Sequence, residues 1–176
     1  MENSKLNILL IEDNPGDAYL IKHMLREANT QGVIPSFALE TAKRLKDGLS
    51  YLAENETSTI LLDLSLPDSL GLDTVHSIAN MAADVPIIVL TGTRDTTLAA
   101  NAIQSGAQDY LVKGKFDANG LGRAIRYAIK RNLLKLNLKQ KHEELKASER
   151  RRQEMFDKSR DGLVMLDGSG KILDAN

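Results

Sequence analysis

The chain of 176 residues contains no cysteine, which excludes a disulfide framework and any metal site built on thiolates. Long hydrophobic runs are also absent, and the longest, from Val85 to Leu90, is far too short to span a membrane. No basic and then apolar leader opens the sequence, because Lys5 directly precedes a short strand-like run. These absences are typical of a protein of a reducing compartment, and we expect a cytoplasmic location.

Helix-breaking residues are scarce in the C-terminal part of the chain. Between Leu121 and about Lys158 there is no proline, and Gly122 is the only glycine. This stretch predicts one helix of about 35 residues, roughly 50 Å long. Residues 121–160 hold 13 Lys and Arg against 5 Asp and Glu, whereas residues 1–120 hold 9 against 16. The charge pattern therefore indicates an acidic domain followed by a basic helical extension.

The predicted long helix carries an incomplete coiled-coil seam. Three leucines fall at seam positions, and the remaining seam positions are polar: Leu134, Leu138 and Leu145 among Lys141, Ser148 and Arg152. We expect a solvated, partly dimeric coiled coil that joins two copies of the chain. Its basic residues could also bind nucleic acid or lipid headgroups, but the helix lacks interleaved aromatic residues and a nucleic-acid recognition motif. We therefore predict neither a nucleic-acid partner nor a membrane partner.

The first 130 residues alternate between strand-like and helical patterns. Strands are predicted over residues 6–11, 36–39, 59–63, 86–91 and 109–112. Helical patterns lie between them, one capped by Thr41 and others over residues 74–83, 96–105 and from 119 onward. This alternation predicts an α/β fold, a doubly wound five-stranded parallel sheet covered by helices on both faces.

Polar side chains follow the central strands at the points where these strands end. They are Glu12 and Asp13 after the first strand, Asp63 at the end of the third, Thr91 at the end of the fourth and Lys113 after the fifth. In doubly wound sheets ligands bind at the carboxyl ends of the strands, so these residues are expected to share one edge. Each type is common at a strand end when taken singly, but the set at one edge indicates a site.

Three converging carboxylates repel each other, so they either hold a proton or recruit a cation. With no histidine or cysteine nearby in the sequence, an all-oxygen site suits Mg²⁺. An aspartate can accept a phosphoryl group as an acyl phosphate, and Lys113 and Thr91 provide a cation and a hydroxyl for the developing charge. The pattern therefore favours phosphoryl chemistry at this edge of the sheet.

Over roughly residues 5–130 the chain resembles the receiver domain of two-component response regulators. The matching motif residues are Glu12, Asp13, Asp63, Pro67, Gly71, Thr91, Tyr110 and Lys113. The resemblance implies a flavodoxin-like sheet with strand order 2-1-3-4-5, continued here by a long C-terminal helix and a short β-hairpin. It also implies a signalling switch and not an enzyme in its own right.

The resemblance assigns a role to each motif residue. Asp63 would accept a phosphoryl group from a histidine kinase or a histidine phosphotransfer protein. Glu12, Asp13, Asp63 and the backbone carbonyl of Ser65 would hold Mg²⁺, and Lys113 would pair with the phosphoryl oxygens.

Thr91 would hydrogen-bond the phosphoryl group, and Tyr110 would rotate inward. The change would pass through helix 4, strand 5 and helix 5 of the family fold. Gly114 follows Lys113 where relatives usually have proline, so a more mobile loop and a less rigidly placed Lys113 are expected.

The last residues resemble the opening of a PAS sensory domain. Two short strand-like runs flank Gly168, Ser169 and Gly170, which predicts a β-hairpin. We expect a receiver domain over residues 1–130, a helical linker over 131–155 and a PAS-like N-terminal fragment over 156–176. A histidine kinase or a diguanylate cyclase often follows such a pair of domains, and nothing in these residues chooses between them.

Three other functions compete with the receiver. An aspartate-nucleophile phosphatase of the haloacid-dehalogenase type normally has a second aspartate two residues after the nucleophile, where Ser65 stands here. A nucleotide- or flavin-binding domain needs a phosphate-cradling glycine loop after the first strand, and Asn14-Pro15-Gly16 does not make one. A kinase helix centred on His142 lacks the proline-containing continuation of that motif.

Overall fold

The structure is a computed structural model that describes residues 5–92, 101–157 and 164–175. It divides into two compact units, Met1–Leu133 and Leu134–Asn176. The elements in chain order are β1 (Leu6–Ile11), α1 (Pro15–Thr30), β2 (Phe37–Ala42), α2 (Leu45–Glu54), β3 (Thr59–Asp63), β4 (Ser65–Leu66), β5 (Ser69–Leu70), α3 (Leu72–Met81), β6 (Ile87–Thr91), β7 (Asp109–Val112), α5 (Ala118–Asp157), β8 (Val164–Leu166) and β9 (Ile172–Ala175).

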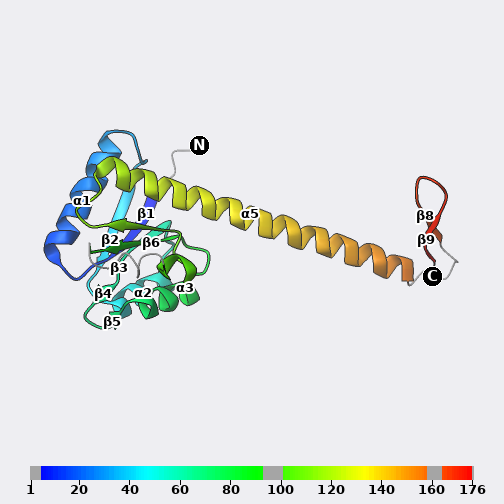
Figure 1. Cartoon of the computed structure of the whole chain (residues 1–176), viewed down its shortest axis with the longest axis horizontal. Coiled ribbons are helices and arrows are strands. Elements are labelled where there is room, and N and C mark those ends of the chain that lie inside the picture. Colours follow the sequence, from blue (N-terminus) through cyan, green and yellow to red (C-terminus); the bar gives the residue numbers. More distant parts are fainter. Residues whose placement is uncertain (1–4, 93–100, 158–163, 176) are drawn as a thin grey trace. The chain divides into compact units, whose positions relative to one another are not determined.

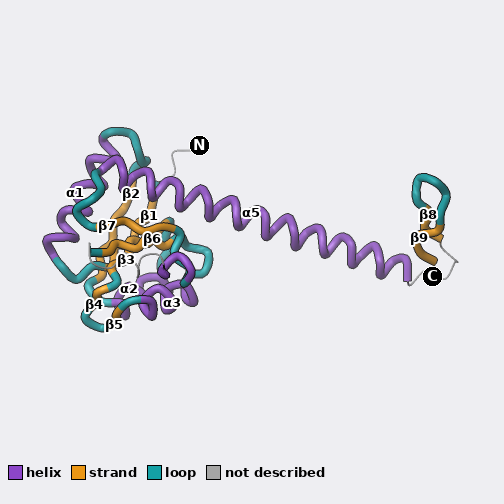
Figure 2. The backbone as a smooth tube through the Cα atoms, viewed as in Figure 1, coloured by secondary structure: helices purple, strands orange, loops and turns teal. Residues whose placement is uncertain are grey.

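The first unit is built on a five-stranded sheet in the order β2-β1-β3-β6-β7, with every neighbouring pair parallel. The small antiparallel β4–β5 hairpin stands apart from this sheet, so the order corresponds to the predicted 2-1-3-4-5. Helices α1 and α5 cover one face of the sheet, and α2 and α3 cover the other (Figures 1 and 2). The predicted doubly wound fold is confirmed.

Two separate half-cores lie on the two faces of the sheet. Side chains alternate along a strand, so neighbouring residues of β3 enter different half-cores. Leu61 packs with residues of α1 and α5, which we call the α1/α5 half-core, whereas Leu62 packs with residues of α2 and α3, the α2/α3 half-core. All five residues of β3 are buried, while β2 at the edge is largely half-exposed. The strand that ends on Asp63 is thus held from both sides.

Helix α1 begins immediately after the acidic pair. Asn14 caps it, because its Oδ1 accepts hydrogen bonds from the amides of Gly16 at 2.8 Å and Asp17 at 3.2 Å. Pro15 stands at the first helical position, where its fixed φ suits the helix. The cap places Asp17 in the first turn of α1, on the side of the sheet edge where β1 ends.

The start of α2 corrects one prediction. Thr41 does not cap this helix, because β2 continues through Ala42, which is paired with Ile11 of β1. The helix begins at Leu45, and its first amides are capped from a distant loop: Asp68 accepts from Leu45 at 2.9 Å and Lys46 at 3.1 Å. Desolvation opposes ionisation of Asp68, but these amide hydrogen bonds outweigh it and lower the pKa of its carboxyl.

Helix α5 packs closely against the end of α1. A Cβ placed on Gly122 would lie 2.7 Å from Val33 Cγ1 and 3.2 Å from Ala28 Cβ, so only glycine allows this approach. Further along α5, the buried Asn132 donates from Nδ2 to the backbone carbonyl of Asp84 at 2.6 Å. This bond ties α5 to the turn that precedes β6.

The second unit contains the remainder of α5 and the β8–β9 hairpin, whose strands pair antiparallel as predicted. Asp167 forms the turn, since its Oδ1 accepts from the amides of Ser169 at 2.8 Å and Lys171 at 3.0 Å.

The helix predicted over residues 96–105 lies partly outside the described residues, and residues 101–104 are helical. Within the described ranges, no helix is long and apolar enough to cross a membrane.

Candidate functional site

Three carboxylates meet at the carboxyl edge of the sheet. Ile11, the last residue of β1, pairs with Leu62 of β3, so Glu12 and Asp63 follow on adjacent strands. The ligand oxygens of Glu12, Asp13 and Asp63 all lie within 4.8 Å of one another. Glu12 is only 1% exposed and Asp63 7%, whereas Asp13 is exposed to solvent. The edge therefore presents two buried carboxylates and one open to water.

Lys113 brings a positive charge into this cluster from the end of β7. Its backbone amide bonds to the carbonyl of Thr91 at 2.8 Å, which fixes where the side chain starts. Its Nζ donates to Glu12 Oε2 at 2.6 Å, Asp63 Oδ2 at 2.7 Å and Asp17 Oδ2 at 2.8 Å. The ammonium group thus bridges three carboxylates that come from three different segments of the chain.

The ionisation of Glu12 and Lys113 is strongly perturbed. Desolvation raises the pKa of Glu12 to about 7, and the negative charge of Asp63 adds to this, although the bond from Lys113 opposes it. Desolvation alone would lower the pKa of Lys113, but its hydrogen bonds to Asp17, Asp63 and Glu12 prevail and raise it. Lys113 is therefore a permanent cation, and Glu12 changes charge near neutral pH.

The other predicted site residues lie around this cluster. Thr91 ends β6, is buried, and donates from Oγ1 to the carbonyl of Gly92 at 3.2 Å. The amide of Ser65 donates to Asp63 Oδ1 at 3.1 Å, which fixes one oxygen of that carboxylate. Tyr110, on the outer strand β7, is 39% exposed. Thr91 and Ser65 are therefore at the edge, whereas Tyr110 is partly exposed to solvent on β7.

Gly114, which follows Lys113, has a backbone conformation that proline cannot adopt. Its φ is +78°, whereas the ring of proline fixes φ near −65°. A proline is thus incompatible with this loop conformation. Lys113 is nevertheless held through its side chain by the three ion pairs.

The sequence interpretation missed Asp17 as a member of the cluster. A signal was present in the sequence. Asp17 stands four residues after Asp13 and three residues after Asn14, a residue type that caps helices. A cap at Asn14 starts α1 at once, and the first turn then brings Asp17 back over the strand ends.

The carboxylate cluster fits a magnesium ion by its chemistry. All of its donors are oxygens, and Mg²⁺ binds through one or two carboxylates while retaining water molecules. The exposed Asp13 leaves room for water, and the buried Glu12 and Asp63 supply the fixed oxygens. The cluster carries more negative charge than its single lysine neutralises, so a further cation is favoured here.

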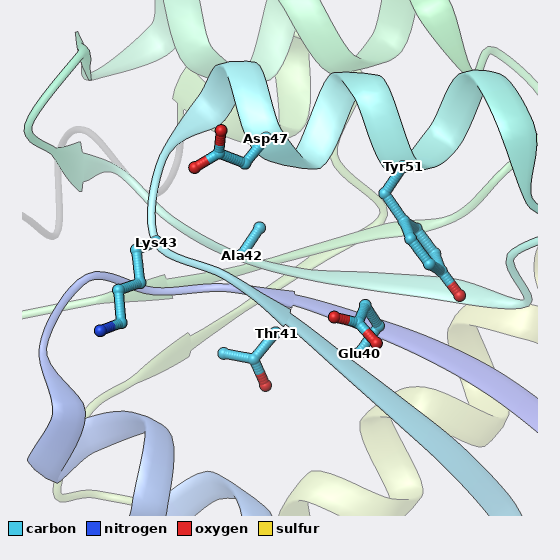
Figure 3. Close-up of a pocket in the computed structure, with 6 residues that line it drawn as sticks. All are labelled: Glu40, Thr41, Ala42, Lys43, Asp47 and Tyr51. Atoms are coloured by element: carbon cyan, nitrogen blue, oxygen red, sulfur yellow. The ribbon is translucent and has the colours of Figure 1, made fainter.

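A hollow of about 350 Å³ lies elsewhere, between the end of β2 and α2. Figure 3 shows Glu40, Lys43, Asp47 and Tyr51 around it. None of the clustered carboxylates lines this hollow, and its charged side chains have mixed signs. The hollow is therefore separate from the carboxylate cluster at the strand ends.

Comparisons with known proteins agree with this geometry. The family model of the response regulator receiver domain matches residues 8–126. The methanogenesis regulatory protein FilR1 of Methanothrix harundinacea is 33% identical over 110 residues, which cover 61% of this chain and 24% of FilR1. The chain thus spans about a quarter of the length of that relative.

Solved structures are similar as well. A response regulator receiver domain protein from Clostridium thermocellum is 29% identical with a TM-score of 0.63, covering 73% of this chain and 98% of that one. The receiver domain of sensor histidine kinase PA1611 from Pseudomonas aeruginosa PAO1 is 27% identical with a TM-score of 0.60, covering 72% and 99%. That crystal structure has a magnesium ion coordinated in its active site cleft.

Proposed function

Because the chain belongs to the response regulator receiver domain family, we propose that it is a phosphorylation-controlled switch in which Asp63 is the phosphoacceptor. The observation that carries this is the position of Asp63: it ends a fully buried strand, 2.7 Å from the Lys113 ammonium. Receiver domains act with histidine kinases or phosphotransfer proteins and are generally signalling modules without an enzymatic activity of their own. The donor proposed for this chain is such a protein.

In the proposed reaction, a carboxylate oxygen of Asp63 attacks the phosphorus of the donor. The bond from phosphorus to the donor imidazole nitrogen breaks, and the imidazole leaves with the electron pair. Lys113 stabilises the phosphoryl oxygens, and the hydroxyl of Thr91 donates to the phosphoryl group once it is released from the carbonyl of Gly92. Glu12, Asp13, Asp63 and the carbonyl of Ser65 would hold Mg²⁺, which would supply positive charge to neutralise the transferring group.

The test is phosphorylation of the full chain by acetyl phosphate in the presence of Mg²⁺, followed by intact mass and tryptic peptide analysis. We expect one hydroxylamine-labile phosphoryl group on the peptide that contains Asp63. Asp63→Asn abolishes this modification, because the amide is not a nucleophile. Asp73→Asn, at an exposed position in the first turn of α3, retains it. Steady release of phosphate from small monoesters without modification of Asp63 contradicts the proposal and favours a phosphatase.

The output is proposed to pass through the 101–112 region and α5 to a C-terminal region. We keep the proposed division into a receiver over residues 1–130, a helical linker over 131–155 and a PAS-like fragment over 156–176. The antiparallel β8–β9 hairpin supports the proposed PAS-like fragment. Its apolar residues Val164, Leu166 and Ile172 are more than half exposed, so a further layer of structure is needed to bury them.

We propose that the linker part of α5 joins two copies of the chain. Leu134, Leu138 and Leu145 are 53%, 70% and 58% exposed, which is unfavourable for a helix without a partner. Light scattering of the full chain should therefore show a dimer. Leu138→Lys with Leu145→Lys should raise the dimer dissociation constant at least tenfold, since like charges would face each other across the seam.

The matched control for the seam is Gln140→Lys with Ala147→Lys. This pair adds the same two positive charges at exposed positions two residues further along the helix, away from the leucines. The control should remain dimeric. A wild-type chain that stays monomeric at every concentration, or equal dissociation of both double variants, contradicts the proposed seam.

A further inference from the structure

The hydrogen-bonding capacity of Lys113 is fully used in the structure. An ammonium group has three N–H donors, and the Lys113 Nζ has three carboxylate acceptors within 2.8 Å: Glu12, Asp63 and Asp17. A phosphoryl oxygen that pairs with Lys113 must therefore displace one of these acceptors. Which acceptor leaves is decided by what each one loses on separation from the lysine.

The three acceptors differ in burial. The side chain of Glu12 is 0% exposed and that of Asp63 is 9% exposed. Neither carboxylate could therefore replace its bond to the lysine with a bond to water. The side chain of Asp17 is 36% exposed and belongs to the first turn of α1, where it is already close to solvent. A charge near water is released at far smaller free energy than a buried one. Asp17 is thus the acceptor that exchanges most easily.

We propose that Asp17 is a positioning residue that holds Lys113 in the unphosphorylated site and yields it to a phosphoryl oxygen on phosphorylation. The proposal rests on the proposed role of Asp63. Asp17 completes the lysine's hydrogen bonds in the resting state, where the loop after Lys113 contains Gly114 in place of a rigid proline. It also places a negative charge at the entrance of a site that receives an anion. Both effects oppose phosphoryl transfer, so Asp17 sets a threshold for the switch.

The test compares the full-length wild type with Asp17→Asn, each at a Mg²⁺ concentration that saturates it. Asp17→Asn should raise the second-order rate constant of Asp63 phosphorylation by acetyl phosphate about three- to fivefold, the range of an exposed ion pair. Calorimetry should show tighter binding of beryllofluoride by a similar factor. A residue that merely supports folding would shift the unfolding temperature without improving either quantity. Asp17→Ser removes the same charge through a second side chain.

Two controls separate the ion pair from general charge. Asp17→Glu keeps a carboxylate on α1 and should retain the wild-type rate, whereas Asp73→Asn removes a charge from the first turn of α3 without affecting the Lys113 ion pairs. The inference is overturned if Asp17→Asn is no faster than the wild type, or if Asp73→Asn accelerates the reaction equally. A wild type that is never phosphorylated on Asp63 overturns the proposed function as well.

Discussion

Lys113→Met is expected to destabilise the protein and at the same time to tighten its binding of Mg²⁺. Without the ammonium, Glu12 and Asp63 remain buried side by side with no cation between them. In a chelator at pH 8, the free energy of unfolding should fall by about 2–4 kcal/mol, somewhat less than for a fully buried ion pair because Lys113 is partly exposed. Urea unfolding followed by circular dichroism measures this loss.

Magnesium should reverse much of that loss. The lysine and the metal compete for the same carboxylate oxygens. Removal of the lysine should therefore lower the dissociation constant for Mg²⁺ about tenfold. Phosphorylation by acetyl phosphate should still slow about 100-fold, because a donor to the phosphoryl oxygens is missing. Lys115→Met, two residues further on at an exposed position, should match the wild type in all three measurements. An unchanged stability and an unchanged magnesium affinity would show that the three ion pairs contribute nothing.

Glu12→Gln is expected to stabilise the metal-free protein, by an amount that grows with pH. The folded state holds the Glu12 proton up to a pKa of about 7, while the unfolded chain releases it near 4.5. The contribution of Glu12 to stability is therefore complete below pH 4.5 and is lost as the pH rises through 7. The amide side chain of the variant does not titrate, so Glu12→Gln should exceed the wild type in stability by about 2 kcal/mol above pH 8 and by little at pH 5.

The measurement is denaturant unfolding in a chelator from pH 5 to 9, with Glu40→Gln as the control. Glu40 is an exposed glutamate of β2, so its substitution should give the same small difference at every pH. Saturating Mg²⁺ should reverse the order of wild type and Glu12→Gln, because the wild type keeps the full carboxylate set. A difference between the two proteins that does not vary with pH contradicts an elevated pKa for Glu12.

The sheet and the strand ends follow from local patterns, which explains why they were predictable. A buried strand needs a continuous apolar run, and the polar residue that ends it is visible in the sequence, as with Ile11 before Glu12 or the TILL run before Asp63. The parallel arrangement then brings Glu12 and Asp63 to one edge without further information. Periodicity therefore predicted that the two carboxylates share an edge, whereas the adjacency of their strands was predicted from the family resemblance.

The remaining features depend on contacts between distant segments. Thr41 has the residue type of a helix cap, but the pairing of Ala42 with Ile11 keeps it in a strand, and Asp68 caps α2 from 22 residues or more away. The bond from Lys113 to Asp17 joins residues 96 positions apart. No local pattern records such pairings. The raised pKa of Glu12 likewise depends on desolvation by the assembled sheet edge.

The two half-cores have a consequence for how the molecule moves. Successive residues of β3 are anchored to opposite helical layers, Leu61 to the layer of α1 and α5 and Leu62 to that of α2 and α3. If one helical layer shifts alone, β3 remains packed against the other helical layer. We therefore expect Asp63, at the end of β3, to keep its position when one helical layer shifts against the sheet.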